Sequence, residues 1–374
     1  MNNISEKSKE KLLMVTMHKG QMKIGKGAGN INVFETYNIA KILERQGFDV
    51  TIATTVDTDI AVAYDKLDVN SFDKVLVMNA LVDFPGGEEN KMINALIRFL
   101  KPYKGVIYNL LVDLAIPFKQ LYPLVKDRKW NKYQKAEEIN LDNEFIILSQ
   151  SPNKEEVKRI YANSGIKIKD IRYVPFNEWI LHTNDFIENT GEVDLIMGTS
   201  FRKGKRTQKY IDYFLRRNDI SVELFGSITE KHFKGFTIPN NVTFTPKLKD
   251  VSKVIEKNAT GYSTVIIGDP NYNNNIITLR FAESLLANCV TFIDDDFDRQ
   301  HKIYPNLPFM YVKNGDDLER KIKYLKANPK FHKAILKIQH NKVEEIRKNN
   351  FPKLLENAIL ENQIQERNDY KWII

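Results

Sequence analysis

Short apolar runs alternate with helical patterns along the whole chain. Runs with strand character lie at residues 12–17, 50–54, 74–79, 106–111, 145–148 and 171–175, and again at 193–197, 222–225, 242–245, 264–267, 290–293 and 310–312. Helical patterns between them, as around Ile39, Ile42 and Leu43, place apolar residues three or four apart. Such alternation is typical of parallel sheets with helices on their faces. The pattern predicts an α/β chain with two open, doubly wound sheets.

A polar stretch separates the two series of strands. Residues 182–192 (HTNDFIENTGE) show neither the strand nor the helix period, which is typical of a linker. After residue 316 the chain is charged and helical, and the apolar stripe Leu354, Leu355, Ala358 and Ile359 predicts that its end packs back onto the domains. Two facing sheets of this class bind ligands at the carboxyl ends of their strands, so we expect the function in a cleft between the domains.

The composition narrows the class of protein. The 374 residues include 42% apolar and 11% aromatic residues, enough to bury a core in each domain, which excludes a disordered chain. The single Cys289 excludes a disulfide framework and predicts a reducing cytoplasm. No apolar stretch reaches the roughly 18 residues of a membrane helix, and the charged N-terminus lacks a signal peptide, so we expect a soluble protein. The net charge of +8 favours an anionic partner, such as nucleic acid or a phosphorylated substrate.

The first candidate motif is MGTSFRKGKR, at residues 197–206, between the predicted strand at residues 193–197 and a helix predicted at residues 206–217. Backbone amides at a helix N-terminus favour an anion. Arg202 and Arg206 lie four apart around Gly204, and each can present a planar fork of donors to phosphate oxygens. A diphosphate clamp and a solvated basic turn both fit this motif, whereas the spacing of a P-loop is absent.

The second candidate motif is IIGDPNYNNNIITLRFAESL, at residues 266–285. A strand ends at Gly268, a polar turn follows, and Arg280 and Glu283 then share one face of a helix. A carboxylate there can accept both ribose hydroxyls of a nucleotide while the arginine meets its phosphates. The alternative is an exposed ion pair worth about 0.3 kcal/mol. The polar turn at the end of a strand favours the nucleotide site.

Two single carboxylates are weaker candidates. Asp113 lies in the apolar segment NLLVDLAIPF at the end of a strand, where a raised pKa would let it take a proton from an alcohol. A structural acid satisfied by a backbone amide would have the same sequence. Glu35 follows a glycine-rich stretch, in the N-terminal turn of its helix, and the residues alone favour a helix-stabilising charge there over a ligand for hydroxyls.

A basic and aromatic strip occupies residues 119–135 (KQLYPLVKDRKWNKYQK). It interleaves Tyr122, Trp130 and Tyr133 with lysines and an arginine, so it can neutralise phosphates while its rings cover a groove or stack on a base. A solvated loop with buried aromatic residues is the alternative. The six histidines form no HExxH motif, and no GxSxG motif is present, so zinc hydrolysis and serine acyl transfer lack support.

At these motifs the chain resembles the DNA β-glucosyltransferase family of T-even phages, from the first strand to the C-terminal helices. The matching blocks are FETYNIAKIL, VMNALVDFPGG, DLAIPFKQLYPLVKDRKW, VPFNEWILHTNDF, GTSFRKGKR, FGSITEKHF, IIGDPNYNNNIITLRFAESL and IDDDFDRQHKI. The resemblance implies a GT-B fold, with two Rossmann-like domains facing a central cleft. It also implies UDP-glucose as the donor, the 5-hydroxymethyl group of a modified cytosine in duplex DNA as the acceptor, and inversion of the anomeric carbon.

The same resemblance implies roles for individual residues. Asp113 matches the catalytic base, Glu35 an acid that lines the sugar site, and Leu248 the residue that holds the uracil. Ser200, Arg202 and Arg206 match the diphosphate loop, Arg280 and Glu283 the phosphate and ribose contacts, and Asp269 and Tyr272 the sugar or phosphate side. On the DNA side we assign Phe84, Pro85, Lys126, Arg128, Lys129 and Lys132. No metal ligand is assigned, and Mg²⁺ or Mn²⁺ is left open.

The chain departs from the family pattern at three places. Phe84 and Pro85 stand where the family has two aromatic residues before its Gly-Gly loop, and Asn177 occupies a glutamate position, beside Glu178. The loop at residues 19–29 is longer and more basic than in the family. These departures leave open another UDP-sugar, for example a pentose such as arabinose, or another hydroxymethylated pyrimidine.

The sequence as a whole therefore predicts an inverting, UDP-sugar-dependent DNA glycosyltransferase. We assign residues 1–182 to the DNA side, 193–345 to the UDP-sugar, and 346–374 to a helix that returns to the N-terminal domain. We expect a monomer in the cytoplasm of an infected bacterial host, which flips the target base out of the duplex. The alternatives are a catalytically silent DNA-binding homologue, disfavoured by Glu283, and a transferase acting on a small molecule or polysaccharide, disfavoured by the basic strip.

Overall fold

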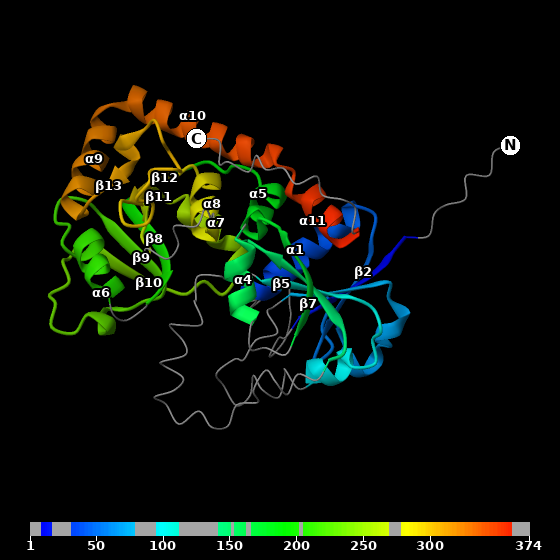
Figure 1. Ribbon diagram of the computed structural model, residues 1–374. Coiled ribbons are helices and arrows are strands. Elements are labelled where there is room, and N and C mark those ends of the chain that lie inside the picture. Colours follow the sequence, from blue (N-terminus) through cyan, green and yellow to red (C-terminus); the bar gives the residue numbers. More distant parts are fainter. Residues whose placement is uncertain are drawn as a thin grey trace. The chain divides into compact units, whose positions relative to one another are not determined.

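The structure of the protein is a computed structural model that describes residues 9–16, 31–78, 95–111, 141–150, 153–161, 166–201, 205–268 and 278–360. The described chain forms two compact units, each with its own sheet. The first unit extends to Trp179 and takes up the chain again at Phe351, and the second spans Ile180–Asn350 (Figure 1).

The sheet of the first unit is parallel, with the order β3-β2-β1-β4-β5-β6-β7 in the described chain. Its strands are β1 (Lys11–Val15), β2 (Asp49–Thr54), β3 (Val62–Ala63), β4 (Lys74–Val77), β5 (Ile107–Leu111), β6 (Glu144–Ser149) and β7 (Lys167–Tyr173). Its helices include α1 (Ile31–Arg45), α4 (Lys154–Tyr161) and α11 (Phe351–Leu360), and α5 (Trp179–Thr183) begins at its last residue before the second unit. Because α1 contacts both β2 and α11, the returning helix belongs to the first unit.

The sheet of the second unit is also parallel, in the order β10-β9-β8-β11-β12-β13 over the described residues. Its strands are β8 (Val193–Ser200), β9 (Val222–Ser227), β10 (Val242–Pro246), β11 (Gly261–Ile266), β12 (Val290–Asp294) and β13 (Tyr311–Val312). Its helices are α6 (Lys205–Tyr210), α7 (Val254–Asn258), α8 (Leu279–Leu286), α9 (Gly315–Ala327) and α10 (Pro329–Lys348). Figure 1 shows α9 and α10 following each other along this unit, where α9 contacts β13 and α10 contacts α8.

The inner strands are apolar at successive positions because helices cover both faces of a parallel sheet. Leu12, Leu13, Met14 and Val15 of β1 are all fully buried. The helix α9 begins where a capping residue predicts. The side chain of Asn314 accepts a hydrogen bond from the Asp317 amide at 2.9 Å before α9. None of the helices in the described part of the chain is long and apolar enough to cross a membrane.

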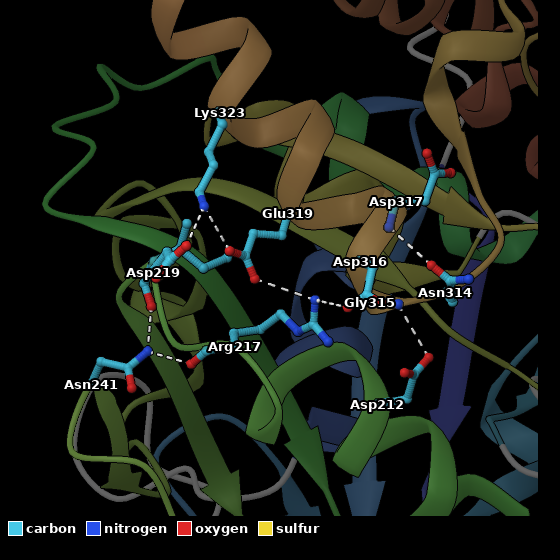
Figure 2. Close-up of polar contacts among 11 residues, drawn as sticks. Asp212, Arg217, Asp219, Asn241, Asn314, Gly315, Asp316, Asp317, Glu319 and Lys323 are labelled. Atoms are coloured by element: carbon cyan, nitrogen blue, oxygen red, sulfur yellow. Dashed lines mark hydrogen bonds and ion pairs between the residues drawn. The ribbon is translucent and has the colours of Figure 1, made fainter.

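A buried arginine joins α9 to the helix that begins as α6 (Figure 2). The guanidinium of Arg217 contacts Asp316 at 2.9 Å and Glu319 at 3.3 Å, although the Arg217 side chain is only 3% exposed. Nearby, Asp212 accepts a hydrogen bond from the Gly315 amide at 3.1 Å. A buried charge is tolerated only when it is paired, so these contacts hold the start of α9 in one place.

The predicted strands agree with the structure to within a few residues, and two predictions need correction. The helix predicted at residues 206–217 ends as an α-helix at Tyr210 and continues as a π-helical turn, Ile211–Leu215. The turn buries Tyr213, Phe214 and Leu215. The spacing of apolar residues predicts a helix here, but it does not distinguish α-helical from π-helical hydrogen bonding. The strand predicted at residues 171–175 instead spans Lys167–Tyr173, because its first half alternates in burial, as suits the edge of a sheet.

The polar stretch at residues 182–192 contains the end of α5 and no further regular element before β8. It is nevertheless bonded to the second unit. The Ile187 amide donates to the Leu286 carbonyl at 2.9 Å, and the Thr190 amide donates to the Ala259 carbonyl at 2.8 Å. The stretch therefore runs along the second unit with fixed hydrogen bonds.

We expect Gly226→Ala to destabilise the second unit more than Gly235→Ala does. Both glycines have a positive φ, +117° and +87°, which costs about 1 kcal/mol for a residue with a Cβ atom. A Cβ at Gly226 would lie 2.3 Å from the Thr199 carbonyl oxygen, whereas a Cβ at Gly235 meets nothing within 4 Å. The clash should add about 1–3 kcal/mol for Gly226→Ala. Urea unfolding of both variants measures the difference, and equal losses would contradict the described end of β9.

Candidate functional site

The described chain contains some of the predicted site residues and not others. Those described are Glu35, Ser200, Arg206, Leu248, Arg280 and Glu283. Those outside the described residues are Asp113, Arg202, Asp269, Tyr272, Phe84, Pro85, Lys126, Arg128, Lys129 and Lys132. The nucleotide side of the predicted site can therefore be built from its residues, and the DNA side stays a prediction.

The described nucleotide-side residues of the second unit lie at or beyond the carboxyl ends of its strands, which we call the carboxyl edge of the sheet. β8 is the first strand of this sheet in sequence and pairs with β9 on one side and with β11 on the other. The order of the strands reverses between β8 and β11, and ligands of open α/β sheets bind outside the carboxyl ends at such a point. Ser200, which is exposed, is the last residue of β8, and the helix with Arg280 and Glu283 follows β11.

Arg280 ties the beginning of α8 to the end of β8. Thr278 caps this helix by accepting a hydrogen bond from the Phe281 amide at 3.2 Å. In the first turn, Nε of Arg280 donates to the carbonyl oxygen of Gly198 at 2.8 Å. The alternative of a simple exposed ion pair with Glu283 does not describe this residue, because Arg280 is partly buried and bonded to the neighbouring strand.

Glu283 lies one turn after Arg280, and its carboxyl has an unusual pKa. Burial of the carboxyl raises the pKa to about 7, and the nearby positive charge of Arg280 opposes part of this rise. The residue retains some solvent exposure, so the group is covered but reachable. A carboxyl with these properties changes charge near neutral pH, which is a common feature of binding sites.

Arg206 occupies the first turn of α6, which follows β8. Its Nε atom is buried, so the alternative of a fully solvated basic turn does not apply to this residue. Beside it in sequence, Phe201 stacks on His232 with the ring centroids 4.3 Å apart and also contacts Tyr210 of α6 at 6.0 Å. The aromatic contacts fix the chain on both sides of residues 202–204.

Leu248 lies two residues beyond the end of β10 and is half-buried. β10 pairs with β9, and β9 pairs with β8, so Leu248 follows the carboxyl end of a strand on the same edge of the sheet as Ser200. An apolar side chain that is partly open at this edge can cover one face of a planar base.

In the first unit, Glu35 differs from the prediction. It was expected in the N-terminal turn of its helix, but α1 begins at Ile31, and its first turn contains no acidic residue. Glu35 is instead one turn further along and only 4% exposed. The helix begins directly after the glycine-rich stretch, so Glu35 lies beyond its first turn, and a charge that stabilises the helix N-terminus is wrong for this residue. Both structural and functional acids are found buried, so the role of Glu35 at the sugar site stays a prediction.

Other buried polar residues near the carboxyl ends of the first sheet were missed by the sequence analysis. They are Thr16, Thr54, Asn109, Ser149 and Gln150, each at most 4% exposed. The hydroxyl of Tyr161 donates to Oδ1 of Asn109 at 2.8 Å, and Gln150 accepts a hydrogen bond from the Asn177 amide at 3.4 Å. Each of these five buried polar residues follows or interrupts an apolar strand, and this pattern in the sequence could have identified them. Glu178, beside Asn177, is buried as well, at 4% exposure.

A lysine that the sequence analysis did not single out also lies at this edge of the second sheet. Lys209 of α6 forms an ion pair with Asp294 at the end of β12 and a second one with Asp296 at 3.2 Å. No sequence signal links Lys209 to Asp294, because the two residues are 85 positions apart. In the part of the chain that the structure describes, no group of His, Cys, Asp or Glu side chains is arranged to hold a metal ion.

Two comparisons with known sequences identify relatives of this chain. The family model for bacteriophage T4 β-glucosyltransferase matches residues 19–180. The DNA β-glucosyltransferase of Enterobacteria phage T4 is 33% identical over 318 residues, which cover 84% of this chain and 90% of that protein.

Solved structures of T4 phage β-glucosyltransferase are also similar. One, in complex with UDP and Mn²⁺, has a TM-score of 0.76 at 30% identity and covers 93% of this chain and 99% of its own. A variant in complex with UDP-glucose has a TM-score of 0.77 at the same identity and coverage. The sucrose-phosphate synthase of Thermosynechococcus elongatus shares the fold alone, with a TM-score of 0.60 at 13% identity.

Both the family and the GT-B fold expected from the sequence motifs are thereby confirmed. The match of 318 residues is longer than either unit, so it extends over both. This chain belongs to the bacteriophage T4 β-glucosyltransferase family of glycosyltransferases.

Proposed function

We propose that this protein transfers glucose from UDP-glucose to the hydroxymethyl group of 5-hydroxymethylcytosine in duplex DNA, with inversion at the anomeric carbon. The observation that carries the proposal is the 33% identity to the DNA β-glucosyltransferase of phage T4 over 84% of this chain. The described nucleotide-side residues support it, because two arginines and one carboxylate lie at the edge where such sheets bind ligands. In this proposal the protein acts as a monomer in the cytoplasm of an infected bacterium.

In this proposal the second unit holds the donor. Arg206 and Arg280, with Arg202, meet the diphosphate and stabilise the negative charge that develops on the departing UDP. Glu283 accepts the ribose hydroxyls, Leu248 covers the uracil, and Ser200 contributes to the diphosphate loop. A divalent cation, Mg²⁺ or Mn²⁺, would neutralise part of the diphosphate charge when bound. Every other role in this proposal is assigned to a side chain of the protein.

The first unit holds the acceptor in the same proposal. Asp113 takes the proton of the hydroxymethyl oxygen as that oxygen attacks C1 of the sugar from the side opposite UDP, which inverts the anomeric carbon. Glu35 lines the sugar site. The DNA is held through its phosphates by the basic residues of the 119–135 strip, and the modified base is flipped out of the duplex.

Transfer of glucose to hydroxymethylated DNA tests the proposal directly. Duplex DNA containing 5-hydroxymethylcytosine is incubated with the protein and UDP-glucose, and the nucleosides are analysed by mass spectrometry. We expect a mass gain of one hexose on that base and none on unmodified cytosine. A panel of UDP-sugars, including UDP-arabinose, and duplexes with other hydroxymethylated pyrimidines identify the preferred pair. UDP at about 100 times its dissociation constant should also stabilise the fold by about 2.7 kcal/mol.

The outcomes separate the candidate functions. Transfer of a pentose alone, or to another pyrimidine alone, keeps the enzyme and changes its substrate. Binding of DNA without any transfer supports the silent homologue. Equal transfer to a free small alcohol removes DNA from the proposal.

Asp113→Asn should abolish transfer while UDP binding stays near normal. The amide keeps the size of the side chain but does not take the proton, and loss of a general base lowers the rate by about 100-fold to 10,000-fold. The rate of glucose transfer and the dissociation constant of UDP are measured on the same preparation. Turnover close to that of the unsubstituted protein would assign the base to another residue.

The raised pKa of Glu283 predicts that the affinity for UDP falls as the pH decreases. The pKa of this carboxyl is about 7. The ionised form can accept hydrogen bonds from both ribose hydroxyls, whereas the protonated form must lose its proton first. Binding is therefore full at pH 8 and should weaken by about tenfold for each pH unit below 7. Glu283→Gln should bind UDP more weakly at pH 8 and lose this dependence, while the titration of UDP itself remains. Identical pH profiles for the two proteins, measured by calorimetry, would rule out Glu283 as the titrating group.

A further inference from the structure

Lys209 is held in an unusual environment on the helix that begins the candidate diphosphate site. It lies three residues after Arg206, so both side chains emerge from neighbouring positions on one side of α6. Its amine contacts Asp294, whose side chain is 4% exposed, and Asp296 at 3.2 Å. The Lys209 side chain is itself 23% exposed. One lysine thus joins the first helix after β8 to the end of β12.

The charges of this cluster depend on each other. Burial raises the pKa of the Asp294 carboxyl, and the hydrogen bond and positive charge of Lys209 oppose this rise. A second hydrogen bond from Lys209, to Asp296, lowers the pKa of that carboxyl. A lysine amine that faces two carboxylates has its charge neutralised within the protein. It is therefore poorly suited to bind a phosphate itself, and well suited to hold its helix in place.

The segment that carries these carboxylates is fixed by its own contacts. The Asp296 amide donates to Oδ1 of Asp294 at 2.9 Å, and Asp295 contacts Nε2 of His301 at 2.7 Å. The His301 ring stacks on Tyr311 with the centroids 3.8 Å apart. The acidic run after β12 is therefore a rigid anchor whose carboxylates have protein partners.

We propose that Lys209 is a positioning residue for the diphosphate site, which it serves by holding α6 at a fixed position against the end of β12 and so fixing the place of Arg206. This inference rests on the proposed function. It concerns a residue that touches no substrate and acts through Arg206. Loss of the amine would leave Asp294 buried without its cation, and α6 would shift to bring water or another partner to that carboxylate.

The chain offers a closely matched control. Lys257 of α7 forms an ion pair with Glu223 at 2.6 Å, and the side chains are 23% and 8% exposed. The burial of this pair resembles that of Lys209 and Asp294, and it lies in the same unit. However, Glu223 is the second residue of β9, whereas Asp294 is the last residue of β12. Lys257→Met therefore reports what the loss of a half-buried ion pair does to the unit in general.

The test compares Lys209→Met, Lys209→Arg and Lys257→Met by calorimetry with UDP and by thermal unfolding. We expect Lys209→Met to raise the dissociation constant of UDP about tenfold and Lys209→Arg to restore most of the affinity. Lys257→Met should lower the unfolding temperature by a similar amount and leave the dissociation constant within about twofold. Equal effects of Lys209→Met and Lys257→Met on UDP affinity would overturn the inference.

A double-mutant cycle distinguishes positioning from direct contact. If Lys209 acts through Arg206, Arg206→Ala and the double variant Arg206→Ala/Lys209→Met should bind UDP equally weakly. Additive losses would contradict the inference and make Lys209 a ligand in its own right. If Lys209→Met does not fold, Asp296→Asn removes the more exposed of the two partners. It should weaken UDP binding by a smaller factor, and an unchanged dissociation constant would overturn the inference.

The inference and the proposed function fail in different ways. No UDP binding by the unsubstituted protein removes the proposed function. Normal UDP binding by the unsubstituted protein and by Lys209→Met removes the positioning role and leaves the function intact.

Discussion

The parallel pairing of β8 with β11 is the constraint on which the nucleotide side of this protein depends. It places the carboxyl ends of the two strands side by side at the point where the strand order reverses. In the described chain, the helix α6 is the next element after β8, and the helix α8 is the next after β11. The hydrogen bond from Arg280 to the Gly198 carbonyl then joins the second of these helices to the first strand. Two sequence motifs that are about 70 residues apart thereby become one site.

The polar contacts at this edge differ in kind from the packing of the core. The core strands are apolar and hold the sheet through burial, which has no preferred direction. In contrast, Arg280 and Lys209 make directed contacts with a carbonyl group and with two carboxylates, and each fixes a helix at one end. Both contacts lie toward the carboxyl end of a strand of the second sheet, β8 for Arg280 and β12 for Lys209.

Much of the fold and part of the site could be predicted because the signals are local. Strand runs and helical periods lie within a few residues of each other, and the three-residue spacing of Arg280 and Glu283 already places them on one face of α8. The π-helical turn after Tyr210 was missed because the spacing of apolar residues predicts a helix without specifying which backbone groups pair in each turn. The contact between Lys209 and Asp294 was missed because it joins positions that are far apart in the sequence. Glu35 was placed one turn too early because the sequence analysis did not use Asn30, a preferred N-cap residue that directly precedes Ile31, to locate the start of α1.

A crystal structure of the protein with UDP bound tests the central claim most directly. The account predicts the diphosphate against the guanidinium groups of Arg206 and Arg280, the ribose hydroxyls on the carboxylate of Glu283, and the uracil beside Leu248. It also predicts that Lys209 keeps its two carboxylate partners and makes no contact with UDP. UDP bound away from the carboxyl ends of β8 and β11, or ribose hydroxyls held by residues other than Glu283, would contradict it.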